Sequence, residues 1–121
     1  MSTSPKLKPV VWIGSSKSDL KALPAPVVDV FGFALYLAQT GGKHSQSKPL
    51  QGFGSAGVLE IIEDWHGNTY RAVYTVLFEK AVFVLHVFQK KATHGVATPK
   101  ADISLIKNRL KIARKEAEEQ S

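Results

Sequence analysis

The three apolar runs between residues 58 and 90 constrain the fold more than any other feature of this sequence. They read VLEIIEDW, TYRAVYTVLF and AVFVLHVFQ, and they are rich in β-branched and aromatic residues. The short links between them are His66-Gly67-Asn68 and Glu79-Lys80. Because links of this length join neighbouring strands as hairpins, we expect a three-stranded antiparallel meander over residues 58 to 90. The third run is apolar on both faces, which is typical of a strand that is covered on both sides.

The residues that precede the meander predict one strand and two helices. The run VVWI, residues 10 to 13, predicts a short outer strand that joins the sheet. Helices are predicted near residues 15 to 22 and 26 to 40, the second because apolar residues recur at spacings of three and four until a glycine pair ends the run. Residues 42 to 57 are rich in Gly, Ser and polar groups, so we expect a long connection there.

The segment after the meander predicts a third helix. Thr98 as N-cap and Pro99 at the first helical position predict a helix over residues 99 to 116. Apolar side chains recur on one side of this helix and basic side chains occupy much of the rest. The apolar stripe consists of Ile103, Ile106, Leu110 and Ala113. The segment therefore predicts an amphipathic basic helix.

The length and the element order indicate one domain. A chain of 121 residues fits a single hydrophobic core. We expect residues 1 to 121 to form a small α+β domain with an antiparallel sheet, two N-terminal helices and a C-terminal basic helix. Residues 1 to 9 and 116 to 121 are expected to be flexible.

Several classes of protein are disfavoured by what the sequence lacks. There is no cysteine, no HExxH motif and no glycine-rich phosphate loop between a strand and a helix, so neither a metal nor a nucleotide cofactor is implied. The N-terminus has no apolar signal region, and no apolar run approaches the roughly 18 residues of a membrane span. We therefore expect a cytoplasmic protein that does not associate with membranes.

The positive charge is concentrated in the last quarter of the chain. Residues 89 to 115 hold eight Lys or Arg residues against Asp102 alone, whereas the remaining residues hold eight bases and nine acids. Such a distribution predicts a basic face for polyanions, although a solvated helix has a similar composition. The helical residues that we expect to contact RNA are Lys100, Lys107, Arg109, Lys111 and Arg114.

Strand alternation brings a second set of cations together. On the third run, alternation places His86, Phe88 and Lys90 on one face and Lys91 on the other. If Arg71 of the neighbouring strand meets one of the two lysines, the pair forms a cradle for a phosphodiester. Two cations at this position stabilise a phosphorane-like transition state, which is chemistry that a metal-independent ribonuclease uses.

Two histidines near this cradle have different interpretations. His86 lies in an apolar run, where a satisfied core histidine is the simpler interpretation. His94 lies in a loop beside the lysines, where an imidazole can act as general acid or base near neutral pH.

Four stretches of the sequence also resemble a known family. They are VVWIGSSKSDLKALP, KPLQGFGSAGVLEI, TYRAVYTV and VLHVFQKKATHGVATPKADISLIKNRLK. Together they resemble the phage-derived branch of the HigB/RelE superfamily of toxins from type II toxin–antitoxin modules. The resemblance covers roughly residues 10 to 114. It implies a RelE-like fold, cleavage of translated mRNA on the ribosome, and neutralisation by a small helix-turn-helix antitoxin.

The resemblance transfers roles only where residues match. Arg71 corresponds to the strand arginine that contacts the scissile phosphate, and Lys90 or Lys91 falls where such toxins carry a basic residue. RelE has a lysine pair on the preceding strand, where this chain has Glu60 and Glu63-Asp64, and it has a tyrosine near the C-terminus, where this chain has no aromatic residue after Phe88. His94 or Tyr74 is then the candidate substitute for the missing acid or base.

Three functional hypotheses follow. The first is a ribosome-dependent mRNA endoribonuclease that inhibits translation. The second is a catalytically weak member that binds RNA or its antitoxin. The third is a subunit that regulates its own operon and reaches operator DNA only through the antitoxin complex.

Overall fold

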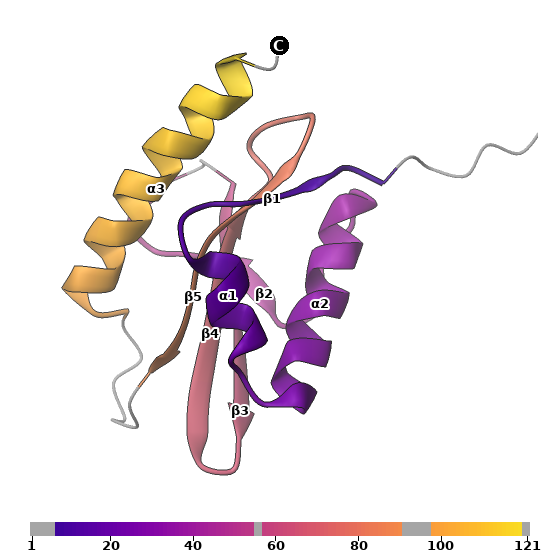
Figure 1. The fold of residues 1–121 in the computed structure, drawn as a ribbon, viewed down its shortest axis with the longest axis vertical. Helices are drawn as coiled ribbons and strands as arrows, with labels where there is room; N and C mark the ends of the chain where they lie inside the picture. The colour runs from indigo at the N-terminus through magenta and orange to yellow at the C-terminus, as the bar shows by residue number, and fades with distance from the viewer. Residues whose placement is uncertain (1–6, 55–56, 91–97, 120–121) are drawn as a thin grey trace, which may run out of the picture.

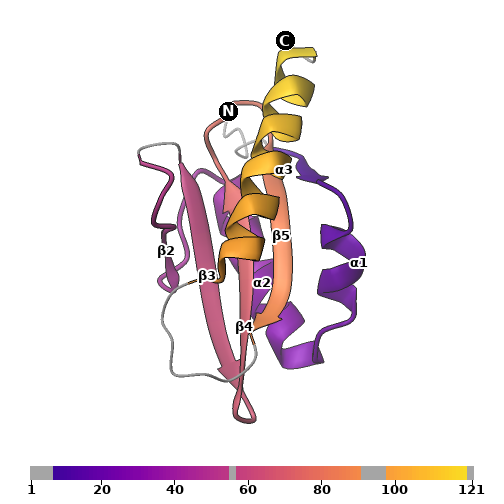
Figure 2. The same cartoon turned by 90° about the vertical axis from the view of Figure 1, so that its left-hand side faces the viewer.

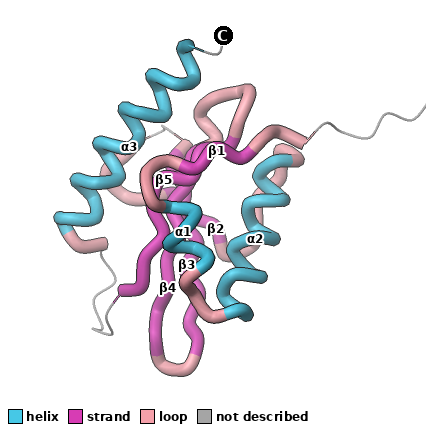
Figure 3. The backbone as a smooth tube through the Cα atoms, viewed as in Figure 1, coloured by secondary structure: helices cyan, strands magenta, loops and turns pink. Residues whose placement is uncertain are grey.

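A computed structural model describes residues 7–54, 57–90 and 98–119. These residues form a five-stranded sheet with helices on both faces (Figures 1 and 3). The elements in chain order are β1 (Val10–Trp12), α1 (Ser16–Lys21), α2 (Ala25–Gln39), β2 (Ser47–Pro49), β3 (Val58–Trp65), β4 (Asn68–Thr75), β5 (Val82–Lys90) and α3 (Lys100–Glu119). The α+β class, the two N-terminal helices and the C-terminal helix are as predicted.

The predicted meander forms the centre of the sheet, whose strand order is β1-β5-β4-β3-β2. Strands β3, β4 and β5 pair antiparallel, and β1 is an outer strand that pairs in parallel with β5, Val10 opposite Val82. The predicted long connection over residues 42 to 57 was wrong in part, because β2 pairs there with β3. Its three residues, Ser47, Lys48 and Pro49, carry no apolar alternation, and proline is tolerated only on an edge.

The helices form two layers with different partners. Helices α1 and α2 cover one face of the sheet, and α3 crosses the other (Figures 1 and 2). Phe31 of α2 packs with Tyr74 in the core on the first face, and Ile106 of α3 packs with Phe83 in the core on the second. Each helix therefore covers the sheet with its apolar side. Within the described ranges, no helix combines the length and the apolar character needed to cross a membrane.

The first and last described residues of the chain contact the rest of the fold. The backbone N–H of Lys8 donates to the carbonyl of Gln39 at 3.1 Å, and the Gln39 side chain donates to the carbonyl of Lys8 at 2.6 Å. Helix α3 continues to Glu119 because Ala117 still packs against the core. The flexibility predicted for residues 1 to 9 and 116 to 121 stays a prediction. Residues 1 to 6, 120 and 121 lie outside the described part.

The helix boundaries follow local signals closely. After α2, the N–H groups of Gly42 and Gly41 donate to the carbonyls of Leu37 and Ala38 at 2.8 and 3.0 Å, with Gly41 at a φ of 87°. These contacts end the helix at the predicted glycine pair. Thr98 was predicted to be the N-cap of the last helix. Helix α3 begins at Lys100, two residues later, so this prediction was wrong.

A β-bulge in β5 changes which residues face α3. Val73 pairs with His86 but Tyr74 pairs with Val84, so Leu85 has no counterpart on β4. Leu85 packs in the core under α3, and the next residue, His86, also contacts that helix. In a regular strand, two successive side chains point to opposite faces. The bulge therefore turns the second half of β5 so that His86 lies under α3.

Candidate functional site

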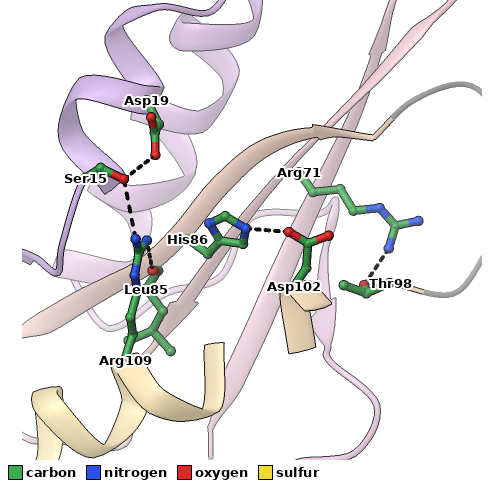
Figure 4. Close-up of polar contacts among 8 residues, drawn as sticks. All are labelled: Ser15, Asp19, Arg71, Leu85, His86, Thr98, Asp102 and Arg109. Atoms are coloured by element: carbon green, nitrogen blue, oxygen red, sulfur yellow. Dashed lines mark hydrogen bonds and ion pairs between the residues drawn. The ribbon is translucent and has the colours of Figure 1, made fainter. Parts of the chain in front are cut away.

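The candidate site is built around Arg71, which lies in the central strand β4. Its neighbours across the sheet are Ile62 on β3 and Phe88 on β5. The residue is 3% exposed, and its Nη1 donates to Glu60 Oε2 at 3.2 Å and to Thr98 Oγ1 at 3.0 Å. Figure 4 shows the contact to Thr98, just before α3. A guanidinium buried in this way requires a counter-charge, which Glu60 supplies.

Lys90, at the end of β5, belongs to the same cluster. It is 7% exposed, and strand alternation places it with His86 and Phe88 on the face of Arg71. Burial lowers the pKa of the Lys90 ammonium from its ordinary value of 10.5, the charge on Arg71 lowers this pKa further, and Glu60 acts in the opposite direction. The structure thus brings Arg71 together with one lysine of the predicted pair. Lys91 lies outside the described residues.

Glu60 on β3 connects this cluster to the edge of the sheet. It is 5% exposed, and its Oε1 lies 3.9 Å from Nζ of Lys48, whose side chain is about half exposed. Glu60 was not predicted to be a site residue, because the sequence shows it only as a departure from the RelE pattern. The missing signal was the strand register, because β2 and β4 place Lys48 and Val73 beside Glu60 only once the pairing is known.

A groove of about 380 Å³ opens beside the cluster. One wall is formed by residues 48 to 51, and the other by Thr98 and Ile103. Glu60 lies between them. Both groups that accept from Arg71 Nη1, Glu60 and Thr98, therefore line the groove.

A second polar contact ties α3 to the sheet. His86 Nε2 lies 2.7 Å from Asp102 Oδ1 (Figure 4). The imidazole ring stacks on Phe88, with 4.4 Å between the ring centroids. The interpretation of His86 as a satisfied core histidine is correct for burial, since the residue is 7% exposed. Asp102 was the missed partner. Its position one helical turn after Thr98 places both contacts at the start of α3.

The basic residues of α3 divide into two groups. Arg109 was predicted to contact RNA, but it points toward the sheet: its Nη1 donates to the carbonyl of Leu85 at 2.9 Å and its Nη2 to Ser15 Oγ at 3.4 Å (Figure 4). Ser15 in turn donates to Asp19 at 2.7 Å. The exposed basic residues of the helix are Lys100, Lys107, Lys111, Arg114 and Lys115. Arg114 also lies over the ring of Phe78 at 5.6 Å.

The remaining candidates lie elsewhere. Tyr74 is fully buried on the opposite face of β4 from Arg71, and its hydroxyl donates to Ser47 Oγ at 2.9 Å. Burial raises the pKa of the Tyr74 hydroxyl above its ordinary value of 10.0, despite the opposing effect of the bond to Ser47. Tyr74 is thus separated from the Arg71 cluster. His94 lies outside the described residues. Among the residues that are described, no three His, Asp or Glu side chains gather as metal ligands would.

The fold and the site together define an α+β domain in which a buried Arg–Lys–Glu cluster lies at the start of a basic helix. The sequence profile of the phage-derived Gp49-like proteins matches residues 18–111. The chain therefore belongs to this family, which is a family of RelE/HigB-type toxins.

One solved structure is also similar to the chain. It is the crystal structure of the toxin–antitoxin complex RelBE2 from Mycobacterium tuberculosis, in which the matching chain is 20% identical. The match covers 75% of this chain and 100% of that chain, with a TM-score of 0.47. Among curated protein sequences, no match was found.

Proposed function

We propose that this toxin is a metal-independent endoribonuclease that cleaves mRNA on the ribosome and so inhibits translation. The observation that carries the proposal is the buried cluster of Arg71, Lys90 and Glu60. Among the described buried residues of this cluster, two cations face one carboxylate, so these residues carry more positive than negative charge. A phosphodiester carries one negative charge and offers oxygens to a guanidinium, so it matches this excess.

The cluster contains groups for both proton transfers of such a reaction. The Glu60 carboxylate takes the proton of the RNA 2′-hydroxyl as O2′ attacks the adjacent phosphorus. The P–O5′ bond then breaks, and the leaving O5′ takes a proton from the Lys90 ammonium. Because the pKa of Lys90 is lowered, this ammonium is a better proton donor than an ordinary lysine. The products are a 2′,3′-cyclic phosphate and a 5′-hydroxyl end.

Arg71 stabilises the charge that develops on the phosphorane-like transition state. Its guanidinium is held in place by Glu60 and Thr98, so little reorganisation is required during the reaction. Lys91, directly after Lys90, and His94, four residues after it, remain candidates for further contacts to the phosphate or for acid–base chemistry.

The ribosome and mRNA are the proposed binding partners of the exposed basic residues on α3, which place the cluster against the mRNA. A cognate helix-turn-helix antitoxin is the proposed third partner, and it neutralises the toxin by covering the cations near the start of α3. Operator DNA is reached only through the antitoxin complex. All of these partners are located in the cytoplasm, where we place the protein.

A second function is favoured by one specific contact. Arg71 already shares its Nη1 between Glu60 and Thr98, so an incoming phosphate has to exchange with these acceptors. If that exchange is too costly, the protein binds RNA or its antitoxin without cleavage and acts in the autoregulation of its operon.

The experiment that tests the proposal is the mapping of mRNA 5′ ends in cells after induction. Cells that express the parent protein should accumulate new 5′-hydroxyl ends within translated regions. Cells that express Arg71→Ala should not, while Lys17→Ala, which removes an exposed lysine on α1, should match the parent. Growth arrest by the parent without new ends would reject cleavage and leave the binding function.

A further inference from the structure

The groove beside Arg71 extends from the buried cluster to the edge strand β2. Its lining includes Glu60 and Thr98, which both accept from Arg71 Nη1. It also includes residues 48 to 51, on and just after β2. A molecule bound in the groove therefore lies next to groups that hydrogen-bond Arg71.

The walls of the groove combine apolar surface with a few polar groups. Pro49, Leu50 and Ile103 supply apolar surface on both sides, while the exposed Gln51 supplies an amide that both donates and accepts. Single-stranded RNA is recognised in this manner, with a base packed by its face and read at its edge by hydrogen bonds. The volume of about 380 Å³ lies within the usual range of small-ligand sites.

Cations lie beside the groove at Glu60. Arg71 Nη1 donates to Glu60 Oε2 at 3.2 Å, and Nζ of Lys48, whose side chain is about half exposed, lies 3.9 Å from Glu60 Oε1. An apolar groove with cations beside it matches a nucleotide, which combines an apolar base with anionic phosphate.

From this arrangement we infer that the groove is a nucleoside subsite, which holds the nucleotide next to the phosphate at Arg71. Gln51 reads the edge of the base, Pro49 and Ile103 contact its faces, and Lys48 contacts the neighbouring phosphate. The inference deepens the proposed function and rests on it for the position of the phosphate. It also makes Gln51 the residue that determines the base preference of the site.

The test compares inorganic phosphate with the four nucleoside 3′-monophosphates, each titrated into the isotope-labelled full chain and followed by NMR. Phosphate should shift the backbone signals of Arg71 and Lys90. At least one nucleotide should in addition shift the side-chain amide of Gln51 and the signal of Leu50. If every nucleotide perturbs only the signals that phosphate perturbs, the subsite is rejected.

Variants separate the groove from the phosphate site. Gln51→Ala should weaken the preferred nucleotide by about tenfold, the size of one base-edge contact, and should leave phosphate binding unchanged. Gln89→Ala, which removes an exposed glutamine from the opposite face of β5 to Lys90, is the matched control and should bind as the parent does. Equal nucleotide binding by Gln51→Ala and the parent would overturn the inference.

The outcomes also distinguish the subsite from the cleavage activity. Nucleotide binding that depends on Gln51, in a protein that produces no new mRNA ends, would support the subsite and reject cleavage. New mRNA ends with the same base preference in the parent and in Gln51→Ala would reject the subsite and support cleavage.

Discussion

The two faces of the sheet bury different kinds of side chain. Under α1 and α2 the core consists of apolar and aromatic side chains such as Phe31 and Val84, with Tyr74 and Ser47 paired to one another. Under α3, an apolar cluster of similar kind is joined by buried charged or imidazole groups. In the described part of the chain these are Glu60, Arg71, His86 and Lys90.

This difference indicates which face is built for stability and which for function. Buried charges cost desolvation energy that apolar residues of similar volume do not, so a face that keeps Glu60, Arg71 and Lys90 gives up stability. Groups of this kind, coupled to one another beside a groove, are typical of functional sites. The start of α3 is held by the Thr98 and Asp102 contacts, which a polar ligand can replace, whereas α2 is held by apolar packing.

The largest effect is expected from the apolar face. Phe31→Ala, at a fully buried position, should lower the free energy of unfolding by about 3 to 5 kcal/mol, because it leaves a cavity between α2 and the sheet. Denaturant titration measures this. Phe33→Ala, an exposed position on the same helix, is the control and should have little effect. A small loss at Phe31 would break the assignment of this face to stability.

The next largest effect concerns catalysis on the polar face. Arg71→Ala should slow cleavage by about 10²- to 10³-fold, because one preorganised group that stabilises the transition state is lost. Arg71→Lys should recover only part of this, since an ammonium cannot form the bidentate contact. Single-turnover cleavage on programmed ribosomes is the measurement, with thermal unfolding to check the fold. Full activity of Arg71→Ala would remove the phosphate cradle from the mechanism.

A comparison within α3 is expected to give a smaller effect. Lys107→Ala should reduce the slope of log affinity for RNA against log salt by about 0.7 to 0.9, because one exposed phosphate contact is lost. Arg109→Ala should leave this slope unchanged and instead lower stability, because its guanidinium bonds the Leu85 carbonyl. Binding titrations at several salt concentrations test both variants. Equal slopes in Lys107→Ala and the parent would contradict a role of this residue in RNA binding.

The smallest effect is expected in the pH dependence of stability. Lys90 has a lowered pKa in the folded state, so the unfolded chain binds more protons between that lowered value and 10.5. Its contribution to stability should therefore increase as the pH rises through this window. Lys90→Met should flatten the rise, whereas Lys17→Met should not. The stabilities of the variants and the parent should be compared below pH 10.0. Above that value, the raised pKa of the Tyr74 hydroxyl makes stability fall as the pH rises.

Periodicity predicted the parts of the fold and site that depend on local sequence. The three runs gave the meander, and alternation gave the shared face of His86, Phe88 and Lys90. The role of Glu60 was not predictable because it depends on the register of β3 with its neighbours. Strand β2 has a polar sequence with proline, which carries no strand signal.

The direction in which each basic side chain of α3 points was also not predictable from the sequence. In the sequence, Arg109 is one of several basic residues on α3, and nothing distinguishes it from its exposed neighbours. In the structure, its guanidinium donates to the carbonyl of Leu85, the residue at the bulge of β5. Gly14 is part of the same arrangement: a Cβ at this position would lie 2.8 Å from Arg109 Cζ. A side chain there would displace the guanidinium, so the turn after β1 lies against helix α3 although the two are far apart in the sequence.

The parallel pairing of β1 with β5 has a consequence for biosynthesis. The ribosome delivers β1 first, but the strand has no partner until residues 82–90 have emerged, when the Val82 N–H can donate to the Pro9 carbonyl and the Ile13 N–H to the Val84 carbonyl. Such pairing over a long stretch of chain is slow to form. Thr98, which accepts from Arg71, is delivered later still. A nascent chain thus cannot assemble its cation cluster until residues 90 to 98 have emerged, which gives the cell an interval in which part of the polypeptide exists but its charged site does not.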